Sequence, residues 1–566
     1  MNPVDQRMAL TRRVYSAIFV IGATLATTTG PAMSAFGLGL VAPGAGFLAT
    51  GQPVMAGLFA LSLVLWFATG NAELPPLIWG GSAVVSAVQT GAIWPAAPPM
   101  VTGLGALAFL ALSIRPHPKP QPSARPFAAP RPTPPKHQLD ATQALLLRLI
   151  LDRALQPLPD FEGFEWIDQF QTAAVRYQIT FASLALSAVQ RTSLPGFQGY
   201  LTEAQLNLAQ KQQDHRVWRY RALENLWGNL RCDTDPIPRD NIMFSGFLAT
   251  QLALVNHATG RPDFDLPGSL QFLHPRMPAY IYDLPQVTAV LLRNLQRARF
   301  GLLPCEPNWI YPLCNLITAT GLRAADPKGW HQVAPRFRTN LTSGFTDRQG
   351  RLIPFRSSLT GFAAPPVGGV VTQAFPCLFL NATFPELAAR HWDQVHRQLA
   401  EDASLRRHIW PIDTGNYGLS RASNYAATAA AAAAMGDGPT AQHLLAALDH
   451  DCPLRDGHRK DASLWAHAVE LLARSLAQGS FRDLAHHRAQ QTPHLAKAPY
   501  PEILVTAARF ENGVLTLTLD PQDPGASCPL ELAGLLPGRH YTVAGPVSQT
   551  LTSDARVTCP YFQGHS

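Results

Sequence analysis

The sequence predicts a mainly α-helical protein with a membrane block in front of the helical part and a small β-module behind it. Three observations support this architecture. Residues 14–113 carry a single formal charge, Glu73. Between about residues 137 and 497, apolar residues recur at helical spacing, with no alternating pattern of the kind typical of strands. After about residue 498 the pattern changes to alternation with a period of two, which is typical of β-strands.

The apolar block is too long and unbroken to be a cleaved signal peptide. Its apolar runs predict four or five membrane crossings, and the glycine-rich run within it is either re-entrant or packed tightly against a neighbouring helix. The runs cover about 15–33, 35–51, 54–71, 76–94 and 99–114.

Basic residues flank the block on both sides before any acidic residue follows it, which places both flanks in the cytoplasm. An even number of crossings then follows, so we expect about four transmembrane helices and a cytoplasmic soluble domain on a bacterial-type inner membrane. Five crossings would reverse that placement. The basic residues are Arg7, Arg12 and Arg13 before the block and Arg115, Lys119, Arg125, Arg131 and Lys136 after it.

Proline divides the membrane block from the soluble part. Residues 115–136 contain repeated Pro and cannot form a helix or the centre of a sheet, so we interpret them as a linker. The predicted organisation is a transmembrane region at 1–114, the linker, a helical domain at 137–497 and a β-rich module at 498–566.

The helical domain shows ten to twelve helical segments, which favours an all-α array of hairpins. Asp140 can cap the first helix, and Asp240 can cap another that ends before Gly260. Residues 321–370 are expected to form a long polar loop, and the alanine run 426–434 a close-packed buried helix. Further helices are predicted at about 166–190, 283–299, 312–321, 384–400, 419–435, 439–449 and 461–477.

In the C-terminal module, Asn512-Gly513 lies between two alternating runs and predicts a β-hairpin. Cys528 and Cys559 fall in the same module, and we assign them no chemical role.

Composition excludes several classes of function. The formal net charge is +7, but much of the excess lies beside the membrane block, where an anionic lipid surface explains it better than nucleic acid does. None of the seven cysteines forms a Cys-x-x-Cys pair, so we predict no metal site. The lack of a dense cysteine framework suits reduced thiols in a reducing compartment.

The stretch from Cys305 to Cys314 is the best candidate for chemistry. Pro307 and Pro312 push the residues before them toward extended geometry, so the stretch should be a loop and a helix should begin at Pro312. Cys314 would then lie in the first helical turn, where the dipole favours a thiolate, while Cys305 keeps a pKa of roughly 8.5. Two thiols in unlike environments can act as an acid and a base, although a disulfide or two ordinary buried thiols remain alternatives.

The same stretch, Cys-Glu-Pro-Asn-Trp-Ile-Tyr-Pro-Leu-Cys-Asn at 305–315, resembles a motif of the linalool dehydratase/isomerase family. Other segments follow in the family's order: Arg176-Tyr177, Val217-Trp218, Asp235-Pro-Ile, Asn241-Ile-Met243, and Tyr417-Gly-Leu through Met435-Gly-Asp437. The resemblance covers about residues 150–480.

This resemblance implies an (α/α)6 toroid and a cofactor-free enzyme that removes water from a tertiary monoterpene alcohol and moves an allylic hydroxyl. It implies that Cys305 and Cys314 transfer protons in a cavity while Tyr177 polarises the substrate oxygen. The chemistry is reasonable because expelling hydroxide needs a proton donor, and forming an alkene needs a base, in a site that excludes water.

Substrate-binding residues are expected around these groups. Glu306 could hold a thiol or cap the next helix, and Met243 would form an apolar wall. Asp235 is either a turn residue or a cavity acid. The family has a histidine where this chain has Phe247, so the activity could differ. The family also places an acid before the Tyr177 segment. The candidates for this acid in the present chain are Asp160 and Asp168.

We therefore expect a membrane-anchored lyase or isomerase acting on a hydrophobic allylic alcohol, terpenoid or other. Its expected partners are a small hydrophobic substrate and the lipid bilayer, with a homo-oligomer allowed for and nucleic acid excluded. Two alternatives remain. One is a carbohydrate-active toroid, which needs two carboxylates roughly 5–10 Å apart. The other is a non-catalytic, membrane-tethered domain that binds a lipid or a partner protein.

Overall fold

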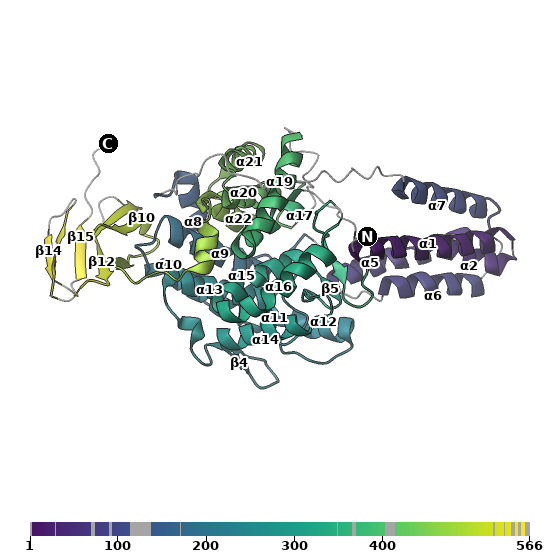
Figure 1. Ribbon diagram of the computed structural model, residues 1–566, viewed down its shortest axis with the longest axis horizontal. Helices are drawn as coiled ribbons and strands as arrows, with labels where there is room; N and C mark the ends of the chain where they lie inside the picture. Colours follow the sequence, from purple (N-terminus) through teal and green to yellow (C-terminus); the bar gives the residue numbers. More distant parts are fainter. Residues whose placement is uncertain are drawn as a thin grey trace.

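The computed structural model is mainly helical and has three parts in a row: an N-terminal helical block, a large helical domain and a C-terminal β-module (Figure 1). The proline-rich linker predicted at 115–136 lies outside the described residues. The structure describes residues 3–28, 30–69, 74–89, 93–113, 137–169, 171–347, 349–364, 370–401, 414–523, 527–536, 538–544, 549–552 and 556–560.

Within the described part of the N-terminal block, one stretch, Ala9–Thr27, is long and apolar enough to cross a membrane. The other helices have 17 residues or fewer, and at 1.5 Å per residue they fall short of the roughly 30 Å hydrocarbon core. Pro31 and Pro53 each start a new helix and so shorten the apolar runs. The helices are α1 (Pro3–Thr28), α2 (Pro31–Val41), α3 (Ala45–Ala49), α4 (Pro53–Ala56), α5 (Leu58–Thr69), α6 (Leu74–Val88) and α7 (Ala97–Ser113).

The glycine-rich helix α2 is packed tightly, which is one of the two arrangements expected from the sequence. A Cβ atom on Gly37 would overlap the Gly22 carbonyl oxygen of α1, and one on Gly39 would lie 2.8 Å from Ala83 of α6. A Cβ atom on Gly46 would lie 2.5 Å from the Ala35 carbonyl oxygen. The chain therefore turns back on itself between α2 and α3, and only glycine fits at these contacts.

The helical domain has an inner set of six helices whose residues are mostly buried. Helix α9 packs against α13, α13 against α15, α15 against α18, α18 against α20, α20 against α22, and α22 against α9. The alanine-rich helix α20 is buried along its whole length, as predicted. These helices are α9 (Val175–Thr192), α13 (Ser245–Thr259), α15 (Pro312–Ala325), α18 (Pro376–Thr383), α20 (Ala422–Met435) and α22 (Leu464–Ser475).

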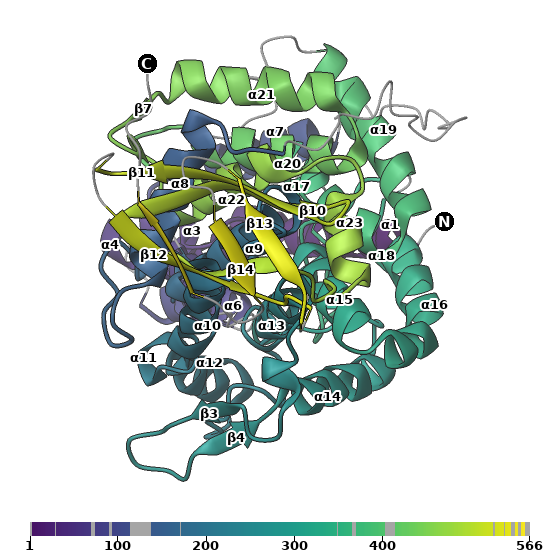
Figure 2. The ribbon, with the colours of Figure 1, turned by 90° about the vertical axis from the view of Figure 1, so that its left-hand side faces the viewer.

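A second set of helices lies outside the first, and Figure 2 shows α14, α16, α19 and α21 along the edge of the domain. Each is amphipathic, with its buried residues toward the inner helices. The outer helices are α8 (Ala141–Ala154), α10 (Gly199–Lys211), α14 (Leu284–Arg297), α16 (Pro327–Gly344), α19 (Pro385–Glu401) and α21 (Gly438–Asp451). Shorter helices are α11 (His215–Trp218), α12 (Tyr220–Asn229), α17 (Val370–Ala374), α23 (Ser480–His486) and a 3₁₀ turn, η1 (Asp263–Asp265).

Several predicted helix boundaries are confirmed. The Asp140 carboxylate accepts a hydrogen bond from the Gln143 amide and forms a capping box at the start of α8. Helix α15 begins at Pro312, and α13 ends just before Gly260, which adopts a φ of +72°. Asp240, in contrast, does not cap α13. It lies in a turn with a φ of +35°, and the helix begins only at Ser245.

Two other expectations are wrong. The helix predicted from residue 166 begins at Val175, because residues 167–172 form the short strands β1 (Ile167–Asp168) and β2 (Gln171–Thr172). The polar loop predicted at 321–370 contains α16. Asp326 caps this helix, and its apolar residues are buried although basic residues and an internal Pro335 obscure their spacing. The buried residues are Trp330, Val333, Phe337 and Leu341.

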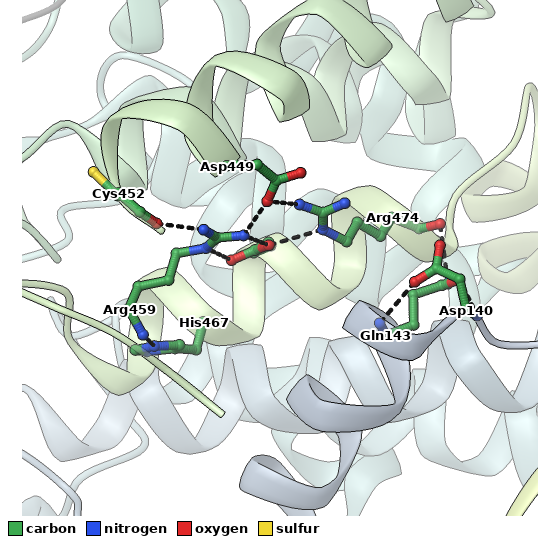
Figure 3. A network of polar contacts seen from close by, with 8 residues as sticks. Asp140, Gln143, Asp449, Cys452, Arg459, His467 and Arg474 are labelled. Carbon is green, nitrogen blue, oxygen red and sulfur yellow. Dashed lines mark hydrogen bonds and ion pairs between the residues drawn. The ribbon is translucent and has the colours of Figure 1, made fainter. Parts of the chain in front are cut away.

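A buried ion network holds the end of the helical domain together (Figure 3). The guanidinium of Arg459, in the hairpin of β7 (Leu454–Arg455) and β8 (His458–Arg459), donates to Glu470 on α22 at 2.6 Å. Arg474 donates to the same carboxylate at 2.8 Å and to Asp449 of α21 at 2.6 Å. Glu470 therefore neutralises two arginines and joins α22 to the hairpin.

We expect Glu470→Gln to lower the free energy of unfolding by about 3 kcal/mol, because it leaves two largely buried guanidinium groups with one partly exposed carboxylate. Urea unfolding followed by circular dichroism measures the change. Glu386→Gln is the matched control, since the Glu386 carboxylate is exposed and lies 3.7 Å from Arg338. Equal stability of both variants would contradict a structural role for the network.

The C-terminal module contains the predicted hairpin. Strands β10 (Ile503–Glu511) and β11 (Val514–Pro521) pair antiparallel, and Asn512 and Gly513 both have positive φ at the turn. Strand β12 (Ser527–Ala533) pairs with β15 (Arg556–Pro560) and with β9 (His494–Lys497), and β13 (His540–Val543) pairs with β14 (Gln549–Thr552). Two further hairpin strands, β3 (Leu270–Phe272) and β4 (Tyr280–Tyr282), lie in the helical domain.

Candidate active site

The chain from Cys305 to Trp309 forms a tight turn that leads into α15. The Cys305 amide donates to the Trp309 carbonyl at 2.8 Å, and the Trp309 amide donates to the Glu306 carbonyl at 3.0 Å. Asn308 takes a φ of +69° and donates from its side chain to the Gly228 carbonyl of α12. The side chain of Asn315 exchanges two hydrogen bonds with the backbone of Leu303. The turn is therefore fixed at both ends, and Cys314 lies in the first turn of α15.

Both cysteines are buried and free, and their side chains lie next to each other. Burial raises the pKa of Cys305 well above its ordinary value, and the neighbouring Cys314 raises it further. The ordinary pKa predicted for Cys305 is therefore wrong, because the sequence did not reveal how completely the turn is covered. Cys305 remains a neutral thiol at neutral pH and can donate a proton.

Arg176, at the start of α9, places a positive charge beside the thiols. The charges of Glu306 and Glu224, the latter from α12, both act on its guanidinium. Burial raises the pKa of Glu224 to about 8, and the charge of Glu306 adds to the effect while Arg176 opposes it. Burial also raises the pKa of Glu306. Two carboxyl groups around one guanidinium thus favour a state in which one carboxyl keeps its proton.

Other polar groups surround Arg176. Its Nη2 donates to the Met243 sulfur at 2.8 Å, and its guanidinium lies 4.2 Å from the centre of the Tyr220 ring. The Nε and Nη1 atoms of Arg176 and the Oε2 atom of Glu224 are buried without a hydrogen-bond partner. Buried polar atoms are rarely left unpaired, so this cluster can take an additional polar group such as a hydroxyl or a water molecule.

The raised pKa of Glu224 predicts a pH dependence of stability. The folded protein keeps this proton up to about pH 8, whereas the unfolded chain loses it near the ordinary value of 4.5. Unfolding therefore releases a proton, and the contribution of Glu224 to stability declines as pH rises from about 4.5 to about 8. We expect Glu224→Gln, which is neutral at every pH, to lose less stability than wild type over this range. Thermal unfolding between pH 5 and 8 measures how the stability of each protein changes with pH. An equal change in both proteins would contradict the raised pKa of Glu224.

A second polar cluster forms around Asp168 of β1. Its carboxylate accepts hydrogen bonds from the Gly415 amide and the Ser463 hydroxyl, each at 2.9 Å. Burial raises the pKa of Asp168, and these two hydrogen bonds oppose the rise. Burial also raises the pKa of Tyr177, and the nearby Asp168 charge raises it further. The Tyr177 hydroxyl is buried and makes no hydrogen bond of normal geometry, so it is available to a ligand.

Two further groups lie beside Asp168. Burial raises the pKa of Tyr417, and the charges of Asp168 and Glu165 add to the effect. Burial raises the pKa of Glu165 itself to about 7, although the hydrogen bond from the Leu464 amide opposes this rise. The cluster therefore contains phenols that stay protonated and a carboxyl that titrates near neutral pH.

Aromatic rings from several inner helices meet next to Tyr177. Phe181, one turn along α9, lies 6.3 Å from the Phe247 ring and 5.6 Å from the Trp465 ring. The rings of Tyr177 and Trp465 lie 6.5 Å apart and perpendicular. Phe247 therefore provides an apolar ring at the place where the family that this chain resembles has a histidine. Such a wall suits a hydrocarbon skeleton and excludes water.

Two residues predicted to bind substrate lie elsewhere. Asp160 is exposed, and its backbone carbonyl accepts a hydrogen bond from Lys211. Asp235 is a turn residue, since its carboxylate accepts hydrogen bonds from the Ile237 amide at 3.0 Å and the Tyr282 hydroxyl at 2.7 Å. The structure places Tyr177, Met243, Glu306 and the two cysteines in the region described above, but neither of these acids.

Sequence reasoning missed Arg176 and Glu224. Arg176 was visible only as the neighbour of Tyr177, and a single arginine in a helix carries no signal of its own. Glu224 lies on the amphipathic helix α12, where a glutamate is ordinarily a surface residue. Their burial and mutual interaction are tertiary features that no local pattern reports.

The N-terminal block contacts the turn that carries Cys305. Trp66 of α5 lies 5.2 Å from the ring of Trp309 and 6.0 Å from the ring of Phe355. Phe355 in turn lies 5.7 Å from the Tyr311 ring, next to Glu306. Figure 1 shows β5 (Trp309–Ile310), which pairs with β6 (Arg356–Ser357), on the side of the domain that faces α1 and α5.

The model of the linalool dehydratase/isomerase family matches residues 176–467, slightly more than half of the chain. The match begins at Arg176 and Tyr177, contains both cysteines, and runs from α9 into the first turn of α22. No curated protein matches the chain. The matched region and the motif from Cys305 to Cys314 together show that this chain belongs to the linalool dehydratase/isomerase family.

Proposed function

We propose that the protein is a membrane-anchored, cofactor-independent hydro-lyase or isomerase that acts on a hydrophobic allylic alcohol, such as a terpenoid alcohol. The observation that carries the proposal is the pair of free, buried thiols beside Arg176, Glu224 and Glu306, within the region matched by the family model. Such a pair offers a proton donor and a proton acceptor in surroundings from which water is excluded.

We assign the following roles. Cys305, whose pKa is raised, donates a proton to the leaving hydroxyl group, so that the carbon–oxygen bond breaks and water leaves. Cys314, in the first turn of α15, removes a proton from the neighbouring carbon to form the alkene. Glu306 and Glu224 exchange protons with the thiols. Tyr177, held near Asp168, donates a hydrogen bond to the substrate oxygen.

We further infer that the helical domain is an (α/α)6 toroid. The pairwise contacts of the inner helices run from α9 through α13, α15, α18, α20 and α22 and return to α9, and an outer helix accompanies each inner one. The aromatic wall lies on inner helices, and both polar clusters lie at the ends of inner helices, with Glu224 added from α12. An experimental structure in which the inner helices did not close a ring would contradict this inference.

The membrane proposal is that the candidate span in α1 crosses the bilayer, with the shorter apolar helices α5, α6 and α7 embedded beside it and α2 and α3 forming a re-entrant hairpin. Large apolar side chains of the block are exposed, for example Val54 at 86% and Val88 at 81%, while Gly22, Gly37 and Gly39 are packed between its helices. Arg7 at the start of α1 and Trp66 near the end of α5 both contact the helical domain, so the N-terminus lies on the same side as this domain. The positive-inside rule makes that side cytoplasmic.

This topology explains how a hydrophobic substrate reaches the site, because the contact of Trp66 with Trp309 joins the block to the turn that carries Cys305. A C-terminal alkaline phosphatase fusion tests the orientation. We expect no phosphatase activity from the fusion, and an active fusion would place the domain on the opposite side of the membrane.

The activity is tested with full-length protein purified in detergent under reducing conditions. We expect linalool and a primary allylic monoterpene alcohol to be interconverted or dehydrated, with the alkene detected in the headspace by gas chromatography. The saturated tertiary alcohol of the same skeleton is the control and should react far more slowly, because its cation lacks allylic stabilisation. Absence of turnover for every allylic alcohol would contradict the proposal.

A carbohydrate-active function is the second candidate, because the structure brings two pairs of acids together, Glu224 with Glu306 and Glu165 with Asp168. The thiols and the aromatic wall favour the alcohol. Hydrolysis of aryl glycosides that is lost in Glu224→Gln but kept in Cys305→Ala would favour the sugar. A lipid retained after purification, without turnover of any substrate, would favour a binding domain.

A further inference from the structure

Three arginines from distant parts of the chain converge where α1 meets the helical domain. The guanidinium carbons of Arg299 and Arg356 lie 5.0 Å and 4.0 Å from the centre of the Phe300 ring. A Cβ atom on Gly361 would lie 3.3 Å from the Arg7 guanidinium carbon and 3.5 Å from the edge of the Phe300 ring. All three positive charges therefore surround Phe300 and Gly361, and we name Arg7, Arg299 and Arg356 the arginine cluster.

The arginine cluster is not neutralised by the described residues around it. Arg356 is 5% exposed, and it donates to the Gly344 carbonyl while its Nε is buried without an acceptor. Arg299 donates to the Leu359 carbonyl at 3.3 Å. The charges that act on Arg356 in the described part of the chain are those of Arg7 and Arg299; with burial they lower its pKa to about 10. An anion bound among these arginines would offset their mutual repulsion.

An apolar pocket of about 400 Å³ opens beside the arginine cluster. It begins at Arg7 and follows α1 to Ile18, a rise of roughly 16 Å at 1.5 Å per residue. Leu10, Val14 and Ile18 lie on one face of α1, and Trp79 of α6 lies opposite. The pocket thus joins a positive end, at the boundary of the candidate span Ala9–Thr27, to an apolar interior.

We propose that the arginine cluster and this pocket bind one anionic phospholipid of the bilayer, with its phosphate on the arginines and an acyl chain along α1. Guanidinium groups bind phosphate oxygens with two parallel hydrogen bonds, and Arg7 lies two residues before the apolar span, at the depth of the headgroups. The lipid holds α1 against the loop that contains Gly361 and so fixes the helical domain on the membrane surface. This inference rests on the proposed membrane anchoring.

Native mass spectrometry of delipidated full-length protein tests the proposal, with dioleoyl phosphatidylglycerol and dioleoyl phosphatidylcholine as probes. We expect tighter binding of phosphatidylglycerol, a roughly fivefold weaker affinity for each Arg→Gln change, and about a hundredfold loss in the triple variant, since each arginine near an anionic surface contributes about 1 kcal/mol. Arg7→Lys, which keeps the charge, should stay within about twofold of wild type. Equal binding of the two lipids, or equal loss in Arg7→Lys and Arg7→Gln, would overturn it.

The matched control is Arg276→Gln, because Arg276 is exposed in the connection between β3 and β4. A loss in this variant as large as in Arg7→Gln would also overturn the proposal. Glycerol phosphate, which lacks the acyl chains, should bind far more weakly than phosphatidylglycerol. If carbonate washing releases the protein from membranes, the proposed anchoring fails; if the protein stays in membranes but shows no preference for the anionic lipid, only this inference fails.

Discussion

Alkene formation is expected to fall roughly 10⁴-fold in the Cys305→Ala, Cys314→Ala double variant. General acid and base catalysis each contribute about 10²–10⁴-fold, and the two thiols are the groups to which we assign these roles. Each single variant should lose about 10³-fold. Because the thiols act as a pair, the loss in the double variant should be smaller than the product of the two single losses. Initial rates with a saturating allylic alcohol measure all three.

Two other cysteines give matched controls for these variants. Cys377 is fully buried in α18 and donates a weak hydrogen bond to the Gln373 carbonyl. Cys377→Ala should therefore cost stability much as Cys305→Ala does but leave turnover within about twofold. Cys232 is exposed, and Cys232→Ala should change neither. Unchanged turnover in both Cys305→Ala and Cys314→Ala would contradict the roles proposed for the thiols.

Asp168→Asn is the second variant with a large expected effect, a loss of about 10³-fold in kcat/KM. An asparagine keeps an acceptor for the Gly415 amide or the Ser463 hydroxyl but removes the negative charge that faces Tyr177. A 10³-fold loss corresponds to about 4 kcal/mol of transition-state stabilisation. Steady-state kinetics measure it, and Asp160→Asn is the control, because Asp160 is exposed and lies outside the site.

Tyr177→Phe separates a functional from a structural role for this cluster. The Tyr177 hydroxyl is buried without a partner, so its removal should leave stability unchanged or raise it by about 1–3 kcal/mol. Activity should nevertheless fall about 10²-fold, because the substrate oxygen loses a hydrogen-bond donor. A variant that is less stable and equally active would show that the hydroxyl serves folding instead.

Features set by a few neighbouring residues were predictable from the sequence. Pro312 starts a helix because its missing amide costs nothing there, and Asp140 with Gln143 caps another. Asn512-Gly513 forms its hairpin because both residues accept positive φ. Helix α16 was not predictable in this way, because exposed basic residues and Pro335 hide its apolar stripe. Asp240 does not cap α13, because it adopts a positive φ.

The candidate site was only partly predictable for the same reason. The cysteine spacing and the family motif pointed to Cys305 and Cys314, but the pKa of Cys305 depends on how α9 and α12 cover the turn. Glu224 joins the site only through the fold, since it lies 81 positions before Cys305 in the sequence. Asp160 and Asp168 could not be separated by sequence, because burial distinguishes them and local pattern does not.

The central claim is that the thiol pair and the cluster of Tyr177 and Asp168 act on one bound alcohol. A structure of the full-length protein with a saturated, unreactive analogue of the substrate tests this most directly. The account predicts the analogue's hydroxyl at about 3 Å from the Tyr177 hydroxyl, with its carbon skeleton against Phe247 and both cysteine sulfur atoms. An analogue bound elsewhere, or one that touches only one of the two clusters, would contradict it.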